Sequence, residues 1–419
     1  MASMSEDRID AAVQELLDGK IKPYEVESLK GCDSAEASLI RKRFLEKKFG
    51  VTLKHIGSST IDFDDAVNRN IESPIGAVQI PLGYAGDIKV NGDSANGSYP
   101  ILLATTEGRL VAGISRGISV VNMAGGVNTI VVRDGMARDV LVRTSDAKHS
   151  GKLAHWIESS EGKEFLKKAF AENTSYGVLI DIRPFVAGRD VHLRFRATTG
   201  AAMGMNMVTI AAKNAVDKMV QHVEGKLGLH IDILSESGNM CSDKKPAYID
   251  FIEGRGVSVT ADIMVPRQLV EESFRVKPEL MVELNKVKNL TGSALAGSHG
   301  FNAHVANTLA AMYIAHGQDA AQIVEGSMAI TDAAMVDDNL YVSLLMPSIE
   351  VGTYGGGTAR ETQKEALSLM GLYGSGDAEG KTRLAFAEVV AAACLTGELN
   401  LLAAEAGMDL AKSHSKIKR

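Results

Sequence analysis

Cysteine is scarce in this sequence. The 419 residues include only Cys32, Cys241 and Cys394, and none of them forms a C-x-x-C pair. This pattern argues against a disulfide framework and against a structural zinc site. The ten histidines include no H-E-x-x-H motif, which is the spacing that helical zinc ligands need. We therefore expect no metal site, and a reducing, cytoplasmic compartment.

A basic excess and a long apolar run are also missing. Lys and Arg number 45 against 52 Asp and Glu, giving a net charge of −7. Nucleic acid is therefore not an expected partner. The Ala- and Leu-rich stretch 384–408 contains Glu388, Glu398 and Glu405, so no run reaches the roughly 18 residues of a membrane span. Acidic residues precede any apolar stretch at the N-terminus, which argues against a signal peptide.

Proline is rare, with 9 residues, whereas glycine is abundant, with 41. Such a backbone has many permissive positions and few rigid bends, which suits a protein whose main chain approaches a ligand closely. The chain length, divided by about 150 residues per domain, predicts two to three domains with ample buried core.

Apolar periodicity predicts an α+β chain in several parts. Residues 1–71 read as a helical N-terminal unit, with an Asp33-x-x-Glu36 capping box before its second helix. Residues 140–235 follow the order β-α-β-β-α-β of a ferredoxin-like unit, with its first helix running through Leu153 and Phe170. The flanks 72–139 and 247–419 then form one larger α/β domain into which this unit is inserted, and 236–246 is the connecting loop.

A basic cluster lies in the second helix of the N-terminal unit. We interpret it as a solvated helix face rather than an anion site. Its members are Arg41, Lys42, Arg43, Lys47 and Lys48.

Four segments place polar groups where packing does not require them, and each has a purely structural alternative. Thr105–Gly108 carries an acid that either relays protons or sits in a first helical turn. In Ser237–Pro246, two lysines beside an aspartate either stabilise an oxyanion or are merely solvated. Asn302–Asn307 leads through the helix-breaking Gly317 to Asp319, for which a simple helix N-cap is the stronger interpretation.

The fourth segment is glycine-rich. It runs from Gly352 to Thr358, follows an apolar strand at 341–346, and ends in a Thr358-x-x-Glu361 capping box. Amide groups at a helix N-terminus suit phosphate, although a structural turn explains the glycines equally well. The basic tail 412–419 holds His414, which either closes over a site or is a solvated chain end.

Taken together, these segments resemble the class I 3-hydroxy-3-methylglutaryl-CoA (HMG-CoA) reductase family over residues 72–414. Six motifs in the family's order carry the resemblance: Glu72-x-x-Ile75-Gly76 with Ile80–Gly83, Thr105–Gly108, Ala202–Met207, Asp243–Pro246, Gly317–Ala321 and Lys412–His414.

The resemblance implies a two-step reduction of HMG-CoA to mevalonate and CoA with two NAD(P)H. It implies that Lys244 stabilises the oxyanion and that Glu107 supplies a proton. Asp319 lies between the two and tunes both, and His414 protonates the CoA thiolate.

The family pattern also assigns binding residues and an assembly. It places the substrate against Arg138, Ser237, Asn239, Asp243, Lys245 and Asn307. It places CoA against Arg116, Lys288 and His304. It places the dinucleotide against Ser175, Gly204, Met205, Asn206, Gly355, Gly356, Gly357 and Thr358 on the small domain and the glycine-rich loop. The family builds its active sites between subunits, so a homodimer or homotetramer is expected, with the N-terminal unit helping assembly.

The sequence departs from the family pattern at the cofactor. Ala201 replaces a usual aspartate, and Tyr176 stands where an arginine usually grips the 2′-phosphate. Arg194 and Arg196 are candidate substitutes for that arginine. NADPH is the expected reductant, with NADH as the alternative. The alternatives for function are the same fold oxidising mevalonate and a CoA-binding homologue without turnover.

Overall fold

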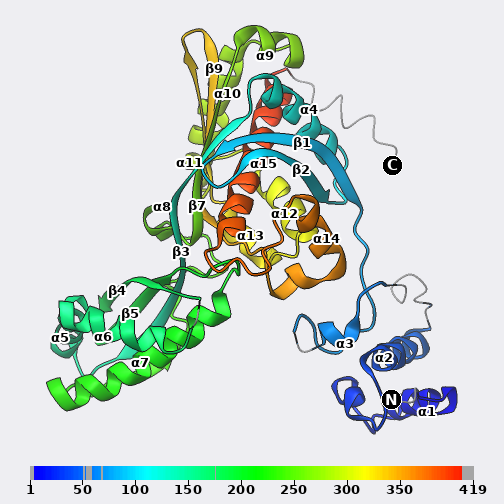
Figure 1. Ribbon diagram of the computed structural model, residues 1–419, viewed down its shortest axis with the longest axis vertical. Helices are drawn as coiled ribbons and strands as arrows, with labels where there is room; N and C mark the ends of the chain where they lie inside the picture. The colour runs from blue at the N-terminus through cyan, green and yellow to red at the C-terminus, as the bar shows by residue number, and fades with distance from the viewer. Residues whose placement is uncertain (1–3, 51, 53–58, 68, 175, 408–419) are drawn as a thin grey trace.

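The computed structural model describes residues 4–50, 52, 59–67, 69–174 and 176–407. It is a mixed α+β molecule, which confirms the predicted class. Buried apolar residues gather in three main clusters. They belong to the N-terminal helices, to a large unit around a six-stranded path, and to a small unit (Figure 1).

The N-terminal helices lie at the lower right of Figure 1. They are α1 (Glu6–Leu17), the 3₁₀-helix η1 (Pro23–Ser28), α2 (Ser34–Phe49) and α3 (Phe63–Ala66). Helix α3 joins them to the large unit through an ion pair between Asp65 and Arg360. The predicted capping box is confirmed, because Asp33 accepts from the Glu36 N–H and Glu36 accepts from the Asp33 N–H.

Arg41 corrects the expectation of a solvated face on α2. Its side chain is only 2% exposed. It is ion-paired with Glu27 and donates to the carbonyls of Pro23 and Pro74 at 2.7 and 3.2 Å. These partners lie 14 to 33 residues away in sequence, so the local charge pattern gave no sign of them.

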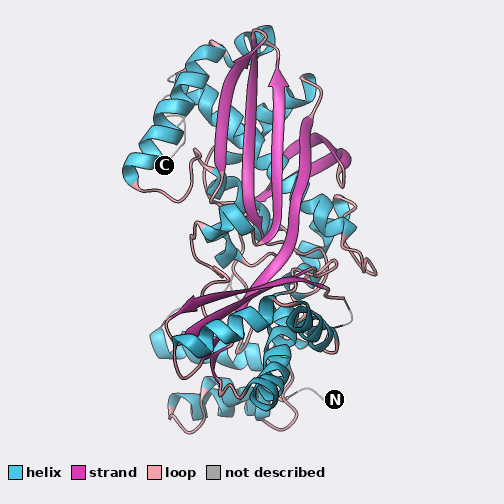
Figure 2. Cartoon of the chain, turned by 90° about the vertical axis from the view of Figure 1, so that its left-hand side faces the viewer, coloured by secondary structure: helices cyan, strands magenta, loops and turns pink. Residues whose placement is uncertain are grey.

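The large unit is built on a sheet with the strand order β2-β1-β3-β7-β9-β8. All its neighbours pair antiparallel except β1 with β3. The strands are β1 (Leu82–Gly92), β2 (Asn96–Ala104), β3 (Val127–Arg143), β7 (Gly256–Val265), β8 (Ile330–Val336) and β9 (Asn339–Ile349). Figure 2 shows the long strands side by side with helices packed against them.

Helix α15 (Lys381–Ala406) is the centre of this unit's core. By length and composition it is the one helix among the described residues that could cross a membrane, yet 83% of its apolar window is buried inside the protein. Its three glutamates are all engaged. Glu388 accepts from the N–H groups of 94 and 95, Glu398 from those of 303 and 304, and Glu405 pairs with Lys288.

The other helices of the large unit surround this core. They are α4 (Leu110–Met123), α8 (Ile249–Glu253), α9 (Arg267–Phe274), α10 (Pro278–Leu284), the π-helix η2 (Asn285–Gly292), α11 (Ser293–Ala296), α12 (Val305–Ala315), η3 (Ala320–Gln322), α13 (Ile323–Gly326), η4 (Gly356–Ala359) and α14 (Glu361–Leu369).

The small unit has the predicted β-α-β-β-α-β order with one difference. The expected first helix is two helices, α5 (Ala147–Glu158) and α6 (Ser160–Ala171). They break at Ser159, whose hydroxyl accepts from the Gly162 N–H and caps α6. The remaining elements are β4 (Leu179–Ala187), β5 (Asp190–Ala197), α7 (Met205–Leu227) and β6 (Asp232–Ser235), and the sheet order is β4-β5-β3-β6.

Strand β3 belongs to both sheets. Its first half, to Gly135, pairs with β7, and its second half, from Met136, pairs with β5. The boundary placed at 139/140 therefore falls inside a continuous strand. At this crossing the buried Arg383 of α15 binds the Asp134 carboxylate at 2.7 Å and the Gly200 carbonyl at 2.6 Å.

Candidate active site

A cleft of about 740 Å³ lies where the small unit meets the large one. Four segments line it: the N-terminus of α7, the connecting loop at 243–244, the turn 317–322 after α12, and the glycine-rich loop 352–358. Arg69, Asn70 and Arg138 complete the lining. Three of the four polar segments singled out in the sequence therefore meet at one place.

Lys244 and Asp319 form an ion pair in this cleft. The Lys244 Nζ atom lies 2.9 Å from Asp319 Oδ2, and the two side chains are 46% and 37% exposed. The hydrogen bond to Asp319 raises the pKa of Lys244 above its usual value. Asp319 also caps η3, because its side chain accepts from the Ala321 N–H. The predicted N-cap and the predicted partner of the lysine are the same carboxylate.

The loop that presents Lys244 is backbone-strained. Asn239, Ser242 and Lys244 have φ values of 71°, 57° and 59°, and such left-handed residues cost about 1–3 kcal/mol each and persist only where the surroundings hold them.

Three buried acids hold this loop. The Asp139 carboxylate accepts from the Met240 N–H at 2.9 Å, Asp250 accepts from the Ser242 hydroxyl at 2.6 Å, and Glu325 accepts from the Lys244 N–H at 2.8 Å.

Arg255 joins the loop to the core through a buried charge cluster. Its guanidinium lies 2.8 Å from Asp243, 2.7 Å from Glu325 and 2.9 Å from Glu350, and the Arg255, Glu325 and Glu350 side chains are 0% exposed. Burial raises the pKa of Glu325 to about 7, against the opposing effect of Arg255, and raises that of Glu350 well above its usual value. The sequence interpretation missed Arg255. Its place directly before the apolar strand at 256–265 was the available signal.

The dinucleotide set lies in the cleft, apart from Ser175. Gly204, Met205 and Asn206 begin α7, whose N-cap Gly204 offers no side chain to its first amides. Free amides at the start of a 23-residue helix attract phosphate. Gly355 and Gly356 have φ values of 80° and 55°, and a Cβ at either would meet open space. These features fit a phosphate-bearing dinucleotide.

The glycine-rich loop does not enter an α-helix directly, and the predicted Thr358–Glu361 capping box is wrong. A 3₁₀ turn, η4, intervenes, and α14 begins at Glu361 with Arg360 as its N-cap. The Thr358 hydroxyl instead donates to the Gly355 carbonyl at 2.6 Å, so it closes the loop. The loop packs against Gly317, where a Cβ would lie 2.4 Å from the Gly357 oxygen.

The predicted substrate residues divide between the cleft and the loop beside it. Arg138 lines the cleft, lies 3.5 Å from Asp243 Oδ2 and donates to the Glu236 carbonyl at 3.0 Å. Lys245 is exposed and donates to the Asp243 carbonyl at 3.0 Å. Ser237 and Asn239 lie in the same loop but do not line the cleft.

Glu107 and Asn307 meet each other but do not line this cleft. The Asn307 amide donates to Glu107 Oε1 at 3.2 Å. Glu107 is exposed in the loop between β2 and α4, so it does not occupy a first helical turn. The structure thus brings together two residues 200 positions apart that the resemblance assigned separately.

Two of the three predicted CoA residues are held by internal side-chain contacts. Arg116 donates to the carbonyls of Ser273 and Phe274, at 3.4 and 3.2 Å. Lys288 pairs with Glu405 at 2.7 Å. The half-buried His304 is the N-cap of α12.

His414 and Ser175 lie outside the described residues. Tyr176 is 64% exposed. The candidate substitutes for the missing arginine are both engaged: Arg194 is 2% exposed and donates to the carbonyls of Met240 and Gly254, and Arg196 binds Asp181. In this structure neither is available for a 2′-phosphate.

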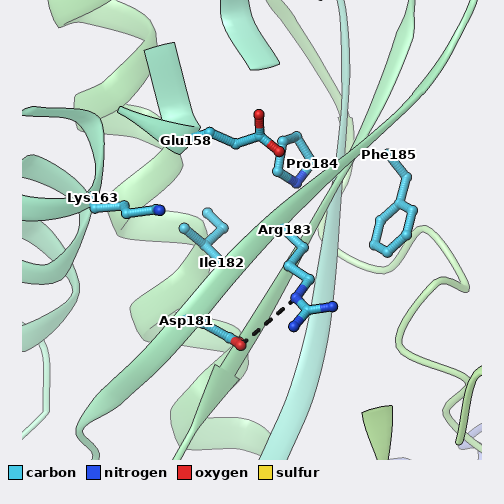
Figure 3. A pocket seen from close by; sticks show the side chains of 7 residues that line it. All are labelled: Glu158, Lys163, Asp181, Ile182, Arg183, Pro184 and Phe185. Atoms are coloured by element: carbon cyan, nitrogen blue, oxygen red, sulfur yellow. Dashed lines mark ion pairs between the residues drawn. The ribbon is translucent and has the colours of Figure 1, made fainter. Parts of the chain in front are cut away.

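A second pocket of about 500 Å³ lies on the small unit (Figure 3). Glu158 and Lys163 come from α5 and α6, and the other lining residues come from β4, among them Asp181 and Arg183, which are 3.8 Å apart. No predicted site residue lines it.

Comparisons with known proteins identify the family of this chain. A family model described as hydroxymethylglutaryl-coenzyme A reductase matches residues 37–419. The 3-hydroxy-3-methylglutaryl-coenzyme A reductase of Pyrococcus abyssi is 46% identical over 98% of this chain and 100% of its own length. The enzyme of Methanothermobacter thermautotrophicus is 45% identical over 97% and 99%.

Among solved structures, a class II enzyme from Streptococcus pneumoniae described as bound to NADPH is similar in fold. Its TM-score is 0.63 at 16% identity, over 87% of this chain and 86% of that one. The family model and the near-full-length relatives together show that the chain belongs to the hydroxymethylglutaryl-coenzyme A reductase family.

Proposed function

We propose that the chain is a class I reductase working in the biosynthetic direction, converting HMG-CoA to mevalonate and CoA in two reductions. HMG-CoA reductase activity itself follows from the family and its curated relatives. The observation that carries the detailed proposal is the Lys244–Asp319 ion pair in a cleft also lined by the α7 N-terminus and the glycine-rich loop.

Lys244 is the proposed oxyanion stabiliser. An ammonium group fixed in a partly enclosed cleft favours the oxygen that gains negative charge when the thioester carbon is reduced, a contact worth ~10²–10³ in rate. Asp319 keeps Lys244 protonated, since their hydrogen bond raises the pKa of the lysine. Arg138, Asp243 and Lys245 flank this group and are proposed to bind the substrate carboxylate and hydroxyls.

Glu107 is the proposed proton donor at the aldehyde stage, with Asn307 orienting its carboxyl group through their 3.2 Å hydrogen bond. Ser237 and Asn239 are proposed substrate contacts, and His414 is the proposed acid for the CoA thiolate. Arg116, Lys288 and His304 are the proposed CoA contacts. The first two must exchange internal partners for the ligand.

NADPH is the proposed reductant, and it supplies hydride to the substrate carbon. A structure of the same fold is described as holding NADPH. The proposed contacts are Ser175 and the residues of the α7 N-terminus and glycine-rich loop. They are Gly204, Met205, Asn206, Gly355, Gly356, Gly357 and Thr358. NADH is the alternative, because Arg194 and Arg196 are both committed to internal partners.

Self-association is part of the proposal. A homodimer or homotetramer with sites between subunits fits Glu107, which stands apart from the cleft lining. The proposed compartment is the cytoplasm, in keeping with Cys32, Cys241 and Cys394, which form no disulfide.

A steady-state assay with HMG-CoA, comparing NADPH and NADH by cofactor absorbance, tests the proposal. We expect Lys244→Ala to lower kcat by ~10²–10³-fold and the matched Lys245→Ala to raise KM for HMG-CoA instead. Consumption of neither cofactor would leave the non-catalytic homologue as the explanation. Turnover only with mevalonate, CoA and oxidised cofactor would identify the oxidative direction.

A further inference from the structure

The Lys244 ammonium can be placed accurately in the cleft only if the strained backbone of Lys244 is fixed. Lys244 has φ 59°, and its N–H donates to Glu325 Oε1 at 2.8 Å. Glu325 belongs to α13, 81 residues further along the chain, and its side chain is fully buried. Glu325 does not line the cleft, so it can affect the cleft only through the loop that carries Lys244.

Arg255 holds the Glu325 carboxylate in place. One atom of Arg255, Nη1, donates to Glu325 Oε1 at 2.7 Å, while Nη2 donates to Asp243 Oδ1 at 2.8 Å. The guanidinium thus contacts the side chain of Asp243, the residue before Lys244. It reaches Lys244 itself indirectly, because Glu325 Oε1 accepts from both Arg255 and the Lys244 N–H. A planar guanidinium with fixed donor directions suits this double role better than a flexible ammonium.

We propose that Glu325 is a positioning residue for Lys244, held against Arg255, and that the reach of its side chain sets where the Lys244 ammonium stands in the cleft. This inference rests on the proposed role of Lys244. It assigns a function to a buried acid that touches neither the cleft nor the reacting atoms.

Glu350 is a matched control within the same cluster. Its side chain is also 0% exposed, and its Oε1 atom accepts from the same Arg255 Nη1 at 2.9 Å. Glu350 does not line the cleft, and the Lys244 N–H donates to Glu325 and not to Glu350. If the cluster contributed only to stability, shortening either glutamate would have the same effect on kcat.

The test compares Glu325→Asp with Glu350→Asp in the HMG-CoA assay. Each change shortens one acid by a methylene. We expect Glu325→Asp to lower kcat about 10-fold, because misplacing a catalytic group by about 1 Å can cost up to ~10²-fold in rate. The KM for HMG-CoA should change less than about threefold, because the contact between the Lys244 ammonium and the substrate oxygen strengthens in the transition state. Glu350→Asp keeps kcat within about twofold, while both lower the melting temperature similarly.

Glu325→Gln supplies the rescue. Its amide oxygen can still accept from Lys244, and its NH₂ group would replace Oε2, which has no hydrogen-bond partner among the described atoms. We expect kcat within about threefold of the parent. This variant also serves if the aspartate variants fail to fold.

Two results would overturn the inference: equal losses of kcat in the Glu325 and Glu350 aspartate variants, or a glutamine variant as slow as Glu325→Asp. Failure of the proposed oxyanion role of Lys244 is recognised separately, because the Lys244→Ala variant would then retain its HMG-CoA reductase activity.

Discussion

At the scale of single residues, the proposed oxyanion stabiliser Lys244 contacts two different acids. Asp319 contacts the Lys244 ammonium, whereas Glu325 contacts its backbone N–H. Because the two acids act on different atoms of Lys244, the protonation and the placement of its ammonium group can be tested independently.

Replacing Asp319 should change the proton affinity of Lys244. The hydrogen bond to Asp319 is the main cause of the raised pKa of Lys244. In Asp319→Asn, that pKa should fall, so the free amine should appear at lower pH. Pulse labelling with an amine-reactive anhydride, read by mass spectrometry across pH, measures this shift. The exposed neighbour Lys245 serves as the internal control, and an unchanged Lys244 profile would refute the prediction.

The sequence identified the exposed residues of the candidate site better than the buried residues behind it. Lys244 and Asp319 stand in short motifs whose residue types match their chemistry. Arg255 and Glu325 are 70 residues apart, and neither carries a local pattern that reveals its partner. Arg41 was misread for the same reason, since a buried arginine looks like a surface one until its distant acceptors are known.

At the scale of elements, local caps were predictable where the helix began at the cap. Asp33 and Glu36 pair reciprocally because α2 starts at Ser34. The equivalent pattern at Thr358 failed because consecutive glycines with positive φ fold the loop back before the helix can begin. The break at Ser159 was hidden because buried apolar residues continue through both α5 and α6.

Helix α12 connects two parts of the site, and both of its ends are fixed by buried groups. Glu398 accepts from the N–H groups of Ala303 and His304, both at 2.7 Å. At the other end His316 is fully buried, and its Nδ1–H donates to the Met312 carbonyl at 2.8 Å. Burial lowers the pKa of His316 to about 4.

His316 should make the protein less stable as the pH falls from about 6.5 to 4. In this window the unfolded chain binds a proton that the folded protein does not, so the free energy of unfolding falls with pH, by up to about 3 kcal/mol. His316→Gln keeps a donor for Met312 but does not titrate. Urea unfolding from pH 4 to 7 should show a flatter dependence in this variant, and parallel curves would contradict the assignment.

At the scale of the whole molecule, the sequence predicted the α+β class and the order of the inserted unit because apolar periodicity is a local signal. It did not predict that β3 continues through both sheets. The inserted unit, whose order opens with this strand, was expected to begin at residue 140, whereas the strand begins at Val127. Residues 130–135 reveal their place only through their pairing with β7, more than 120 positions away.

The shared strand has a thermodynamic consequence: we expect it to couple the stability of the two cores. Losing either sheet removes two of the four strands that pair with β3, so unfolding of one unit should destabilise the other. Trp156, the protein's single tryptophan, lies in the small core. Its fluorescence should therefore respond to damage in the large core.

Leu344→Ala tests this coupling, since Leu344 is fully buried in the large core. The truncation should cost about 2–5 kcal/mol and lower the Trp156 fluorescence midpoint as much as the midpoint seen by circular dichroism. A fluorescence transition that stays in place would mean that the two cores behave as separate thermodynamic units in spite of the strand they share.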